Sequence, residues 1–388
     1  MKRSWIAAAL LIAAPASALD VLPSLALRQS VLGLRQQLPT MRDWDGLAEL
    51  RARPGLTLRG AQAAGSLEIE TRLFSGTGNP LWPQPQAQRF TGLKWTAVDQ
   101  GDVVIAGWID RADVTLHAGP VDIQIGRQPV GLGTAHFLGV LDIIAPFAPG
   151  DLDATFRPGV DALRLRGMAG ARLEWEVAAV GADPVSTSGS WARGRILLDQ
   201  GDLELVGGWL RRRGFGGLGF DGEAGLASIW AEALVIDATG APRRGGKVAA
   251  AAIIGAGGRP LSELWIEGAM LGQSHGVGRD DLLAAVGSGW VQEGWWFLVG
   301  HAHAMATIDW EATALSHLSA TGVLSLTDGS MFMQPRWTFS VSDEADLSAY
   351  GWITAGKGAR LVPPAIPEPR SEFGSLPRGV GLYARWFF

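Results

Sequence analysis

The last ten residues of the chain constrain its fold more than any other segment, because two kinds of side chain alternate along them. Residues 379–388 read GVGLYARWFF. Counted back from Phe388, one face carries Trp386, Ala384, Leu382 and Val380, and the other carries Phe387, Arg385, Tyr383 and Gly381. Side chains of an extended strand alternate between its two faces, so one face here is apolar and the other is mixed. Two structures fit this pattern: a strand with lipid on one side, and the edge strand of a soluble sheet.

The N-terminus predicts export from the cytoplasm. Lys2 and Arg3 precede an apolar run from Ile6 to Ala14, and the small residues Ala16-Ser17-Ala18 follow it. This order is typical of a signal peptide, which we place at residues 1–18. The run is too short for a retained membrane helix, and we find no later stretch of roughly 20 apolar residues. If the mature chain enters a membrane, it must therefore do so as a closed β-barrel.

Composition excludes several classes of protein. The chain has no cysteine, so neither disulfides nor thiolate metal sites are available. Its formal net charge of -5 gives no support to nucleic-acid binding. Glycine and tryptophan are abundant, at 53 and 17 residues, and only 18% of residues are charged. A chain with this composition can place apolar surface in lipid.

Internal segments repeat the two-residue alternation. Residues 66–74 and 172–179 each place apolar side chains on one parity and charged ones on the other, and residues 263–270, 307–312 and 336–341 do the same. Short turns alternate with longer connections, as they do in outer-membrane barrels. We therefore predict an all-β fold, a transmembrane antiparallel up-and-down β-barrel of roughly 16 strands, with about 14 to 18 allowed, over residues 56–388.

Residues 19–55 follow a different pattern. Leu25, Val31, Leu32, Leu34 and Leu38 recur at near-helical spacing, and Pro39 ends the run. We predict a short helical segment that lies in the periplasm or plugs the lumen.

Two segments resemble known barrels. The C-terminal GLYARWFF resembles the closing strand of bacterial outer-membrane β-barrels, in which the terminal aromatic serves the assembly machinery. Residues 125–165, from a GRQ strand to RPGVDALRL, are similar to porin-like barrels, including alginate-export-type proteins. The resemblance implies a Gram-negative outer membrane, an assembly signal at Trp386 and Phe388, and contacts with outer-membrane lipid, lipopolysaccharide and the barrel-assembly machinery. Leu132 and His136 depart from the family pattern, so the resemblance does not identify the solute.

The connection within residues 130–159 is long and apolar, and its prolines prevent regular strand pairing. Apolar content of this kind requires burial, so we predict an inward-folded loop that narrows the pore. The loop acids would approach arginines of the flanking strands, and these charges either line a constriction or only anchor the loop. The predicted constriction residues are Arg127, Asp142, Asp151, Asp153, Arg157, Arg164 and Arg166.

Strand parity also predicts the residues that line the rest of the pore. They are Glu68, Glu70, Arg72, Lys94, Glu174, Glu176, Glu263, Glu267, Asp309, Glu311, Arg336 and Arg385. Acids outnumber bases on the predicted lumen faces, which favours cations weakly unless opposed charges pair across the wall.

For the aromatic and histidine residues outside the loop, both a structural role and a functional role are possible. Tryptophans on apolar parities would form interfacial girdles, whereas Tyr350 and Trp352 fall on the inner parity and could form a stacking surface. His301 and His303 share a strand face and are either polar lining or part of a metal site.

We predict a porin-like outer-membrane channel for passive or weakly selective passage of small polar solutes or ions. The alternatives are a non-conducting structural barrel and an outer-membrane hydrolase built on Ser274-His275. We expect no enzymatic activity, cofactor, metal or nucleic-acid partner. The oligomeric state, the solute and the ion selectivity stay open.

Overall fold

The computed structural model describes residues 20–35, 37, 44–76, 89–90, 92–136, 138–146, 155–239, 247–295, 298–363 and 366–388. The predicted signal peptide, Asp151 and Asp153 lie outside these residues.

Strands dominate the described chain. They are β1 (Asp20–Arg35), β2 (Trp44–Arg59), β3 (Ala63–Gly76), β4 (Lys94–Gln100), β5 (Val103–Ala118), β6 (Val121–Pro129), β7 (Gly159–Ala169), β8 (Leu173–Gly181), β9 (Gly189–Leu198), β10 (Gly201–Leu210), β11 (Arg213–Ala224), β12 (Ala227–Asp237), β13 (Val248–Leu261), β14 (Leu264–Gln273), β15 (Ala302–Thr313), β16 (Ser316–Ser325), β17 (Met331–Ser342), β18 (Ala345–Ala355), β19 (Arg360–Val362), β20 (Ile366–Glu368) and β21 (Arg378–Phe387). Short helical turns are η2 (Val185–Thr187), η3 (Arg279–Asp281), α2 (Leu282–Val286) and α3 (Gly289–Gln292). No helix among these residues is long and apolar enough to cross a membrane.

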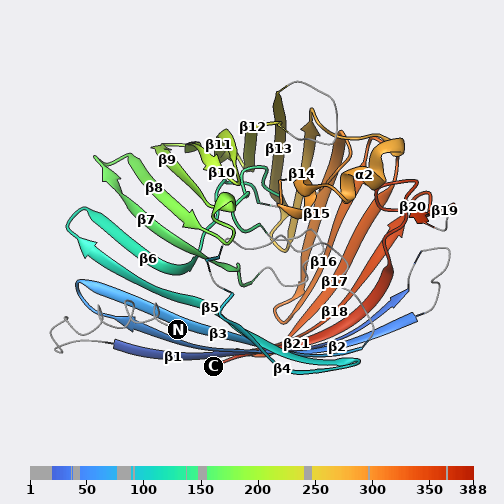
Figure 1. Cartoon of the computed structure of the whole chain (residues 1–388), viewed down its shortest axis with the longest axis horizontal. Helices are drawn as coiled ribbons and strands as arrows, with labels where there is room; N and C mark the ends of the chain where they lie inside the picture. Colours follow the sequence, from blue (N-terminus) through green and yellow to red (C-terminus); the bar gives the residue numbers. More distant parts are fainter. Residues whose placement is uncertain are drawn as a thin grey trace.

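The long strands close into one antiparallel ring of 18 (Figure 1). Neighbours in sequence pair with each other, and the first and last strands close the ring, with Ala26 opposite Phe387 and Arg35 opposite Arg378. Phe388 completes the seam, because its N–H and C=O pair with the backbone of Leu25 at 2.8 and 2.9 Å. β4 is an additional strand that pairs with β5 alone. The predicted fold class is confirmed, with the strand number at the upper end of the predicted range.

The prediction for residues 19–55 is wrong. Residues 20–35 and 44–59 are not a helical plug but two strands of the wall, β1 and β2. The near-helical spacing has a physical cause, since β1 carries apolar side chains on both faces: Val31 points outward and is 54% exposed, whereas Leu32 and Leu34 are buried inside the ring. A strand that is apolar on both faces loses the alternation that distinguishes it from a helix.

The two ends of the ring differ in their connections. Two-residue turns lie at the end of the ring where β1 begins and β21 ends; examples are Asp199–Gln200 and Gly225–Leu226. The connections 130–158, 274–301 and 356–377 lie at the other end, which we call the long-loop end. Residues 211–212 form a tight turn between β10 and β11. Arg211 and Arg212 both have positive φ, 49° and 65°, as a two-residue hairpin turn of this hand requires.

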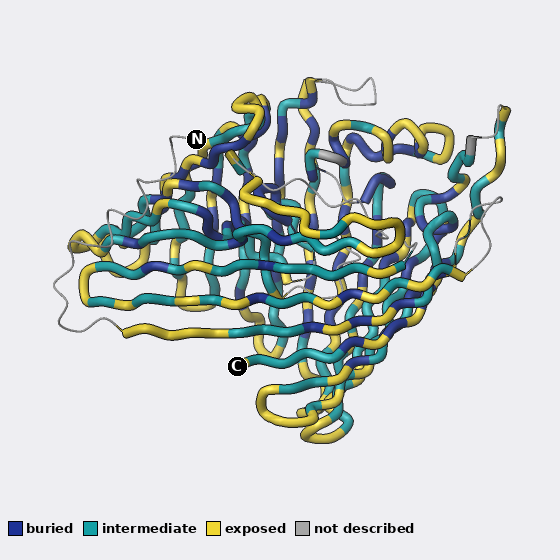
Figure 2. The backbone as a smooth tube through the Cα atoms, turned by 60° about the horizontal axis from the view of Figure 1, so that its bottom comes forward, coloured by how far each residue is buried: buried dark blue, intermediate teal, exposed yellow. Residues whose placement is uncertain are grey.

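The outer surface of the ring is apolar. Outward residues such as Leu205, Ile254 and Val380 are 60–64% exposed, and buried and exposed positions alternate along the strands (Figure 2). Trp44 lies opposite Arg35 and Trp386 lies opposite Leu27, so these outward tryptophans are eight residues apart along β1. That separation is about 26 Å along the strand, which for a strand tilted by about 40° is about 20 Å in height, within the ~25 Å apolar band of membrane barrels.

The inner face packs against the long connections, which fold back into the ring. One apolar cluster joins the 130–146 segment and the α2–α3 segment to the wall through Leu141, Ile144, Trp191 and Trp290. A second cluster joins Phe373 of the 356–377 segment to other wall strands. The predicted inward-folded loop is therefore present, and two further connections accompany it.

Candidate pore constriction

The 130–146 segment crosses the interior of the ring (Figure 1), and two carboxylates of the wall bind its backbone. Glu232 of β12 accepts backbone N–H groups from Thr134, Ala135 and Leu141 at 2.6, 2.8 and 3.0 Å. Glu204 of β10 accepts a fourth N–H, from Gly133, at 3.1 Å. A carboxylate that accepts several backbone N–H groups makes strong charge-assisted hydrogen bonds, so these contacts fix the path of the loop.

Two arginines hold the rest of the loop. The buried Arg211 donates to the carbonyls of Ile143 and Ile144 at 2.9 and 3.2 Å. Burial lowers the pKa of Arg211 to about 10, which leaves the guanidinium charged at neutral pH. Arg157 binds Asp142 at 2.6 Å and the carbonyl of Ala145 at 2.8 Å. Burial raises the pKa of Asp142, and Arg157 opposes that shift.

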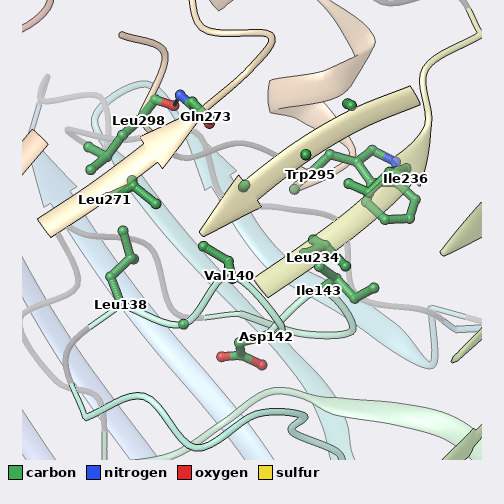
Figure 3. Close-up of a pocket in the computed structure, with 15 residues that line it drawn as sticks. Leu138, Val140, Asp142, Ile143, Leu234, Ile236, Leu271, Gln273, Trp295 and Leu298 are labelled. Carbon is green, nitrogen blue, oxygen red and sulfur yellow. Dashed lines mark hydrogen bonds between the residues drawn. The ribbon is translucent and has the colours of Figure 1, made fainter. Parts of the chain in front are cut away.

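The underside of the loop is packed against the wall. Figure 3 shows Val140 and Ile143 facing Leu234, Ile236 and Trp295 across a small apolar space. The cavity between them is about 40 Å³, which is the size of one or two water molecules. The loop is therefore packed closely against this part of the wall.

The wall formed by β21, β1, β2 and β3 carries a row of arginines that runs across the strands. Arg385 of β21 lies directly across from Arg28 of β1, Arg28 from Arg51 of β2, and Arg51 from Arg72 of β3. Like charges directly opposite each other destabilise a sheet unless other charges compensate them. Compensation comes from acids on the same face, since Glu49 binds Arg28 at 2.6 Å.

Arg53 lies at the centre of this wall and is only 4% exposed. It binds Glu68, Glu70 and Asp110 at 2.7, 2.9 and 2.6 Å. A β-bulge at residue 110 interrupts the pairing of β5 with β3, because Glu68 pairs with Arg111 whereas Ile69 pairs with Ile109. The bulge lets neighbouring residues of β5 reach the same side of the sheet, where Asp110 binds Arg53 and Arg111 binds Glu68 at 3.2 Å.

Within the described residues, ion pairs of 3.6 Å or less connect six arginines with four carboxylates on this wall. They are Arg28, Arg51, Arg53, Arg72, Arg89 and Arg111 with Glu49, Glu68, Glu70 and Asp110. We call this set the arginine cluster; its formal charge is +2. Within this set arginines outnumber carboxylates, whereas the net charge of the whole lumen stays a prediction.

Arg28, Arg51 and Arg53 were not predicted to line the lumen wall, because residues 19–55 were expected to lie in the periplasm or to plug the lumen. The signal was present in residues 49–53, where Glu49, Arg51 and Arg53 alternate with Leu50 and Ala52. A strand interpretation of that segment would have put all three charges in the lumen.

Among the predicted constriction residues on strands, Arg164 and Arg166 share the inner parity of β7, whereas Arg127 shares the parity of the outward residue Ile125. Their partners are not the acids of the loop. Arg127 binds Asp161 of the neighbouring strand at 2.7 Å, and Arg164 binds Glu176 at 2.9 Å. Arg166 donates to Gln124 at 3.3 Å. Asp142 pairs with Arg157 of its own loop. The expected network between loop acids and wall arginines is thus replaced, among the described residues, by pairs within the wall and within the loop.

Most predicted lining residues also lie on the inner face of ring strands. They are Glu68, Glu70, Arg72, Glu174, Glu176, Glu267, Asp309, Glu311, Arg336 and Arg385. Two predictions are wrong. Lys94 begins β4, which is not one of the ring strands, and Glu263 lies exposed in the turn before β14. The roles of the remaining residues in permeation stay predictions.

The other sequence candidates differ in burial. His303 is fully buried and lies 2.8 Å from Glu372, which also accepts the N–H groups of Val299 and Gly300. Ser274 is exposed; its hydroxyl accepts the N–H of Ala250 at 2.9 Å and lies 3.0 Å from Nδ1 of the buried His275. The described residues contain no group of three metal-ligating side chains. Tyr350 and Trp352 point inward as predicted, with ring centroids 5.1 Å apart.

Comparison with known proteins identifies the architecture. No family model and no curated protein matches the sequence. Solved structures match nearly the whole chain: OprD of Pseudomonas aeruginosa has a TM-score of 0.59 at 10% identity, with 95% of each chain covered. OccAB4 of Acinetobacter baumannii has a TM-score of 0.59 at 6% identity and covers 95% of this chain and 98% of its own. This is the fold of a bacterial outer-membrane porin.

A third porin, OccK11 (OpdR) of Pseudomonas aeruginosa, has a TM-score of 0.56 at 11% identity and covers 95% of this chain and 96% of its own. Identities this low establish the porin fold alone. The lumen side chains of this chain must therefore be interpreted from its own geometry.

Proposed function

We propose that the chain is an outer-membrane channel for small polar solutes, with its narrow region between the 130–146 segment and the arginine cluster. The observation that carries this proposal is the fixation of the loop inside the ring by four backbone N–H bonds to Glu232 and Glu204. A loop held at this level divides the lumen and leaves the charged wall as one side of the path.

The arginine cluster favours solutes that carry a carboxylate or phosphate group. Its formal charge is +2, and guanidinium groups bind planar oxyanions through paired hydrogen bonds. A positive field in a narrow, partly dehydrated path attracts anions and repels cations. We therefore expect weak anion selectivity, opposite in sign to the expectation from sequence.

The proposed cellular partners follow from the ends of the chain and from its outer face. The backbone of Phe388 closes the ring against Leu25, and we propose that this terminal strand is the segment presented to the barrel-assembly machinery. The exposed apolar belt would contact outer-membrane lipid and lipopolysaccharide.

The test is the reversal potential of single channels in a planar bilayer under a salt gradient. We expect a sign that indicates preference for chloride over potassium, and a smaller preference in Arg72→Gln, which reduces the cluster to +1. The matched control is Arg172→Gln, whose side chain is 67% exposed near the short turn after β7. A preference for potassium in the unmodified protein would contradict the proposed selectivity.

A non-conducting barrel is the second candidate, because three connections fold into the lumen and form two apolar clusters with the wall. A correctly folded protein that gives no conductance steps would favour this candidate over the channel.

A further inference from the structure

The outward face of the seam between the first and last strands contains an apolar groove. Its floor includes small outward residues of β1 and β18, the two strands that flank β21. They are Gly33, beside which the ring of Trp44 lies, and Ala349 and Gly351. Val380 and Leu382 of β21 border it and are 60% and 55% exposed. The groove has a volume of about 870 Å³, within the usual range of ligand pockets, about 300–1,000 Å³. Small residues on a membrane surface let an apolar group approach the backbone closely.

Two arginines lie at one end of this groove. Arg35 and Arg378 are directly opposite each other in the β1–β21 ladder, and both line the groove and are exposed. They share the outward parity of Val31 and Val380. Side chains directly opposite in an antiparallel pair have Cβ atoms about 5 Å apart, and like charges at that separation repel. This arrangement therefore destabilises the sheet unless an anion lies between the two guanidinium groups.

The described residues supply no carboxylate for either arginine. No acidic side chain among them makes an ion pair with Arg35 or Arg378, and the recorded side-chain bond of Arg378 goes to the carbonyl of Thr354 at 3.0 Å. On the inner face, Arg28 binds Glu49 and Arg53 binds Asp110, both at 2.6 Å. A counter-charge for the outer pair would have to come from outside the described residues.

The position of the pair defines the source of that anion. Arg35 and Arg378 lie at the long-loop end of their strands, level with Trp44, which pairs with Arg35 and is 60% exposed. Long loops of outer-membrane barrels are extracellular, and exposed tryptophans mark the interface between headgroups and acyl chains. The arginines are therefore at the height of lipid phosphates in the outer leaflet, with the apolar groove running below them into the acyl region.

We propose that this seam groove binds one molecule of lipid A, the phosphorylated glycolipid of the outer leaflet, with a phosphate between Arg35 and Arg378 and an acyl chain along Gly33, Gly351 and Ala349. Charge complementarity favours lipid A over a phospholipid. A phosphomonoester carries about -1.5 to -2 charges at neutral pH and matches two arginines, whereas a phosphodiester carries only one. The inference rests on the proposed outer-membrane location and not on conduction, since both arginines point away from the lumen.

The experiment is native mass spectrometry of the purified barrel in detergent, titrated separately with bisphosphorylated lipid A and with phosphatidylglycerol. We expect one lipid A per barrel and at least about tenfold weaker binding of phosphatidylglycerol. The variant Arg35→Gln/Arg378→Gln should lose at least about tenfold in lipid A affinity, because charge-assisted bonds are removed. Arg172→Gln at the opposite end of the barrel is the matched control and should bind as the unmodified protein does.

A second variant tests the acyl part of the site. Gly351→Leu fills the groove floor with an apolar side chain suited to a lipid-facing position, and it should weaken lipid A binding while both arginines remain. Heat-modifiable migration on gels confirms that each variant is folded, and unchanged conductance separates this site from the channel. Equal binding of both lipids, undiminished binding by the arginine variant, or occupation of the groove by a second copy of the chain would overturn the proposal.

Discussion

Replacement of Glu232 by alanine should release the constriction loop. Glu232 is 3% exposed and accepts the N–H groups of Thr134, Ala135 and Leu141. Its removal leaves three donors without their partner, and each unsatisfied buried donor costs about 1–3 kcal/mol. Because lumen water can reach part of the loop, we take the lower limit, about 3 kcal/mol in total. A change of that size shifts the ratio of docked to released loop by about a hundredfold.

The replacement by glutamine should have a smaller effect, because Thr134 and Ala135 bind one carboxylate oxygen and Leu141 binds the other. A glutamine oriented to keep the first two bonds loses only the third, so we expect a loss of about 1 kcal/mol. Release of the loop should be largest in Glu232→Ala and smaller in Glu232→Gln. The control Glu263→Ala, in an exposed turn, should resemble the unmodified protein.

Single-channel recording and limited proteolysis together measure the release. Glu232→Ala should raise the conductance and its fluctuation, and it should expose the segment 130–158 to protease while the barrel keeps its heat-modifiable migration. If Glu232→Ala shows the unmodified conductance and the unmodified resistance to protease, the assignment of Glu232 as the anchor of the constriction is wrong.

Three further predictions concern the wall and the seam. Arg53→Met leaves three carboxylates without their shared counter-charge and should destabilise the barrel by roughly 3 kcal/mol in urea unfolding followed by tryptophan fluorescence; an unchanged midpoint would count against the cluster. Arg164→Ala removes the partner of Glu176 and should shift the reversal potential toward cations without affecting assembly, so identical selectivity and conductance would argue that this arginine does not face the path. Deletion of Phe388 removes the two backbone bonds to Leu25 and should reduce the amount of inserted protein in outer-membrane fractions, and normal levels would contradict the role of the terminal residue.

The sequence predicted the barrel because its strands alternate between lipid and lumen, and that alternation is local. Its failures came where a strand is apolar on both faces. Leu32 and Leu34 of β1 face inward because inward-folded connections cover the inner face of the ring, and that contact is not visible in the local pattern. Because β1 and β2 were not expected in the wall, Arg28, Arg51 and Arg53 were missing from the predicted lumen, and the arginine cluster was not foreseen.

The partners of the charged residues were also beyond prediction from sequence. Asp110 of β5 reaches Arg53 of β2 past the intervening strand β3, through a bulge in β5, and the two residues are 57 positions apart in sequence. Parity assigns a side chain to the inner face, but only the register between strands decides which charges meet. For the same reason the opposition of Arg35 and Arg378 could not be predicted from sequence, because only closure of the ring brings β1 and β21 together.

The central claim is that the folded ring conducts through a path bordered by the arginine cluster. The most direct measurement is the single-channel conductance of the purified, heat-modifiable protein in a planar bilayer, with a salt gradient across it. The account predicts stable conductance steps and a reversal potential of the sign for anion preference. Silence from correctly folded protein would contradict the channel, and steps with cation preference would contradict the role given to the arginine cluster.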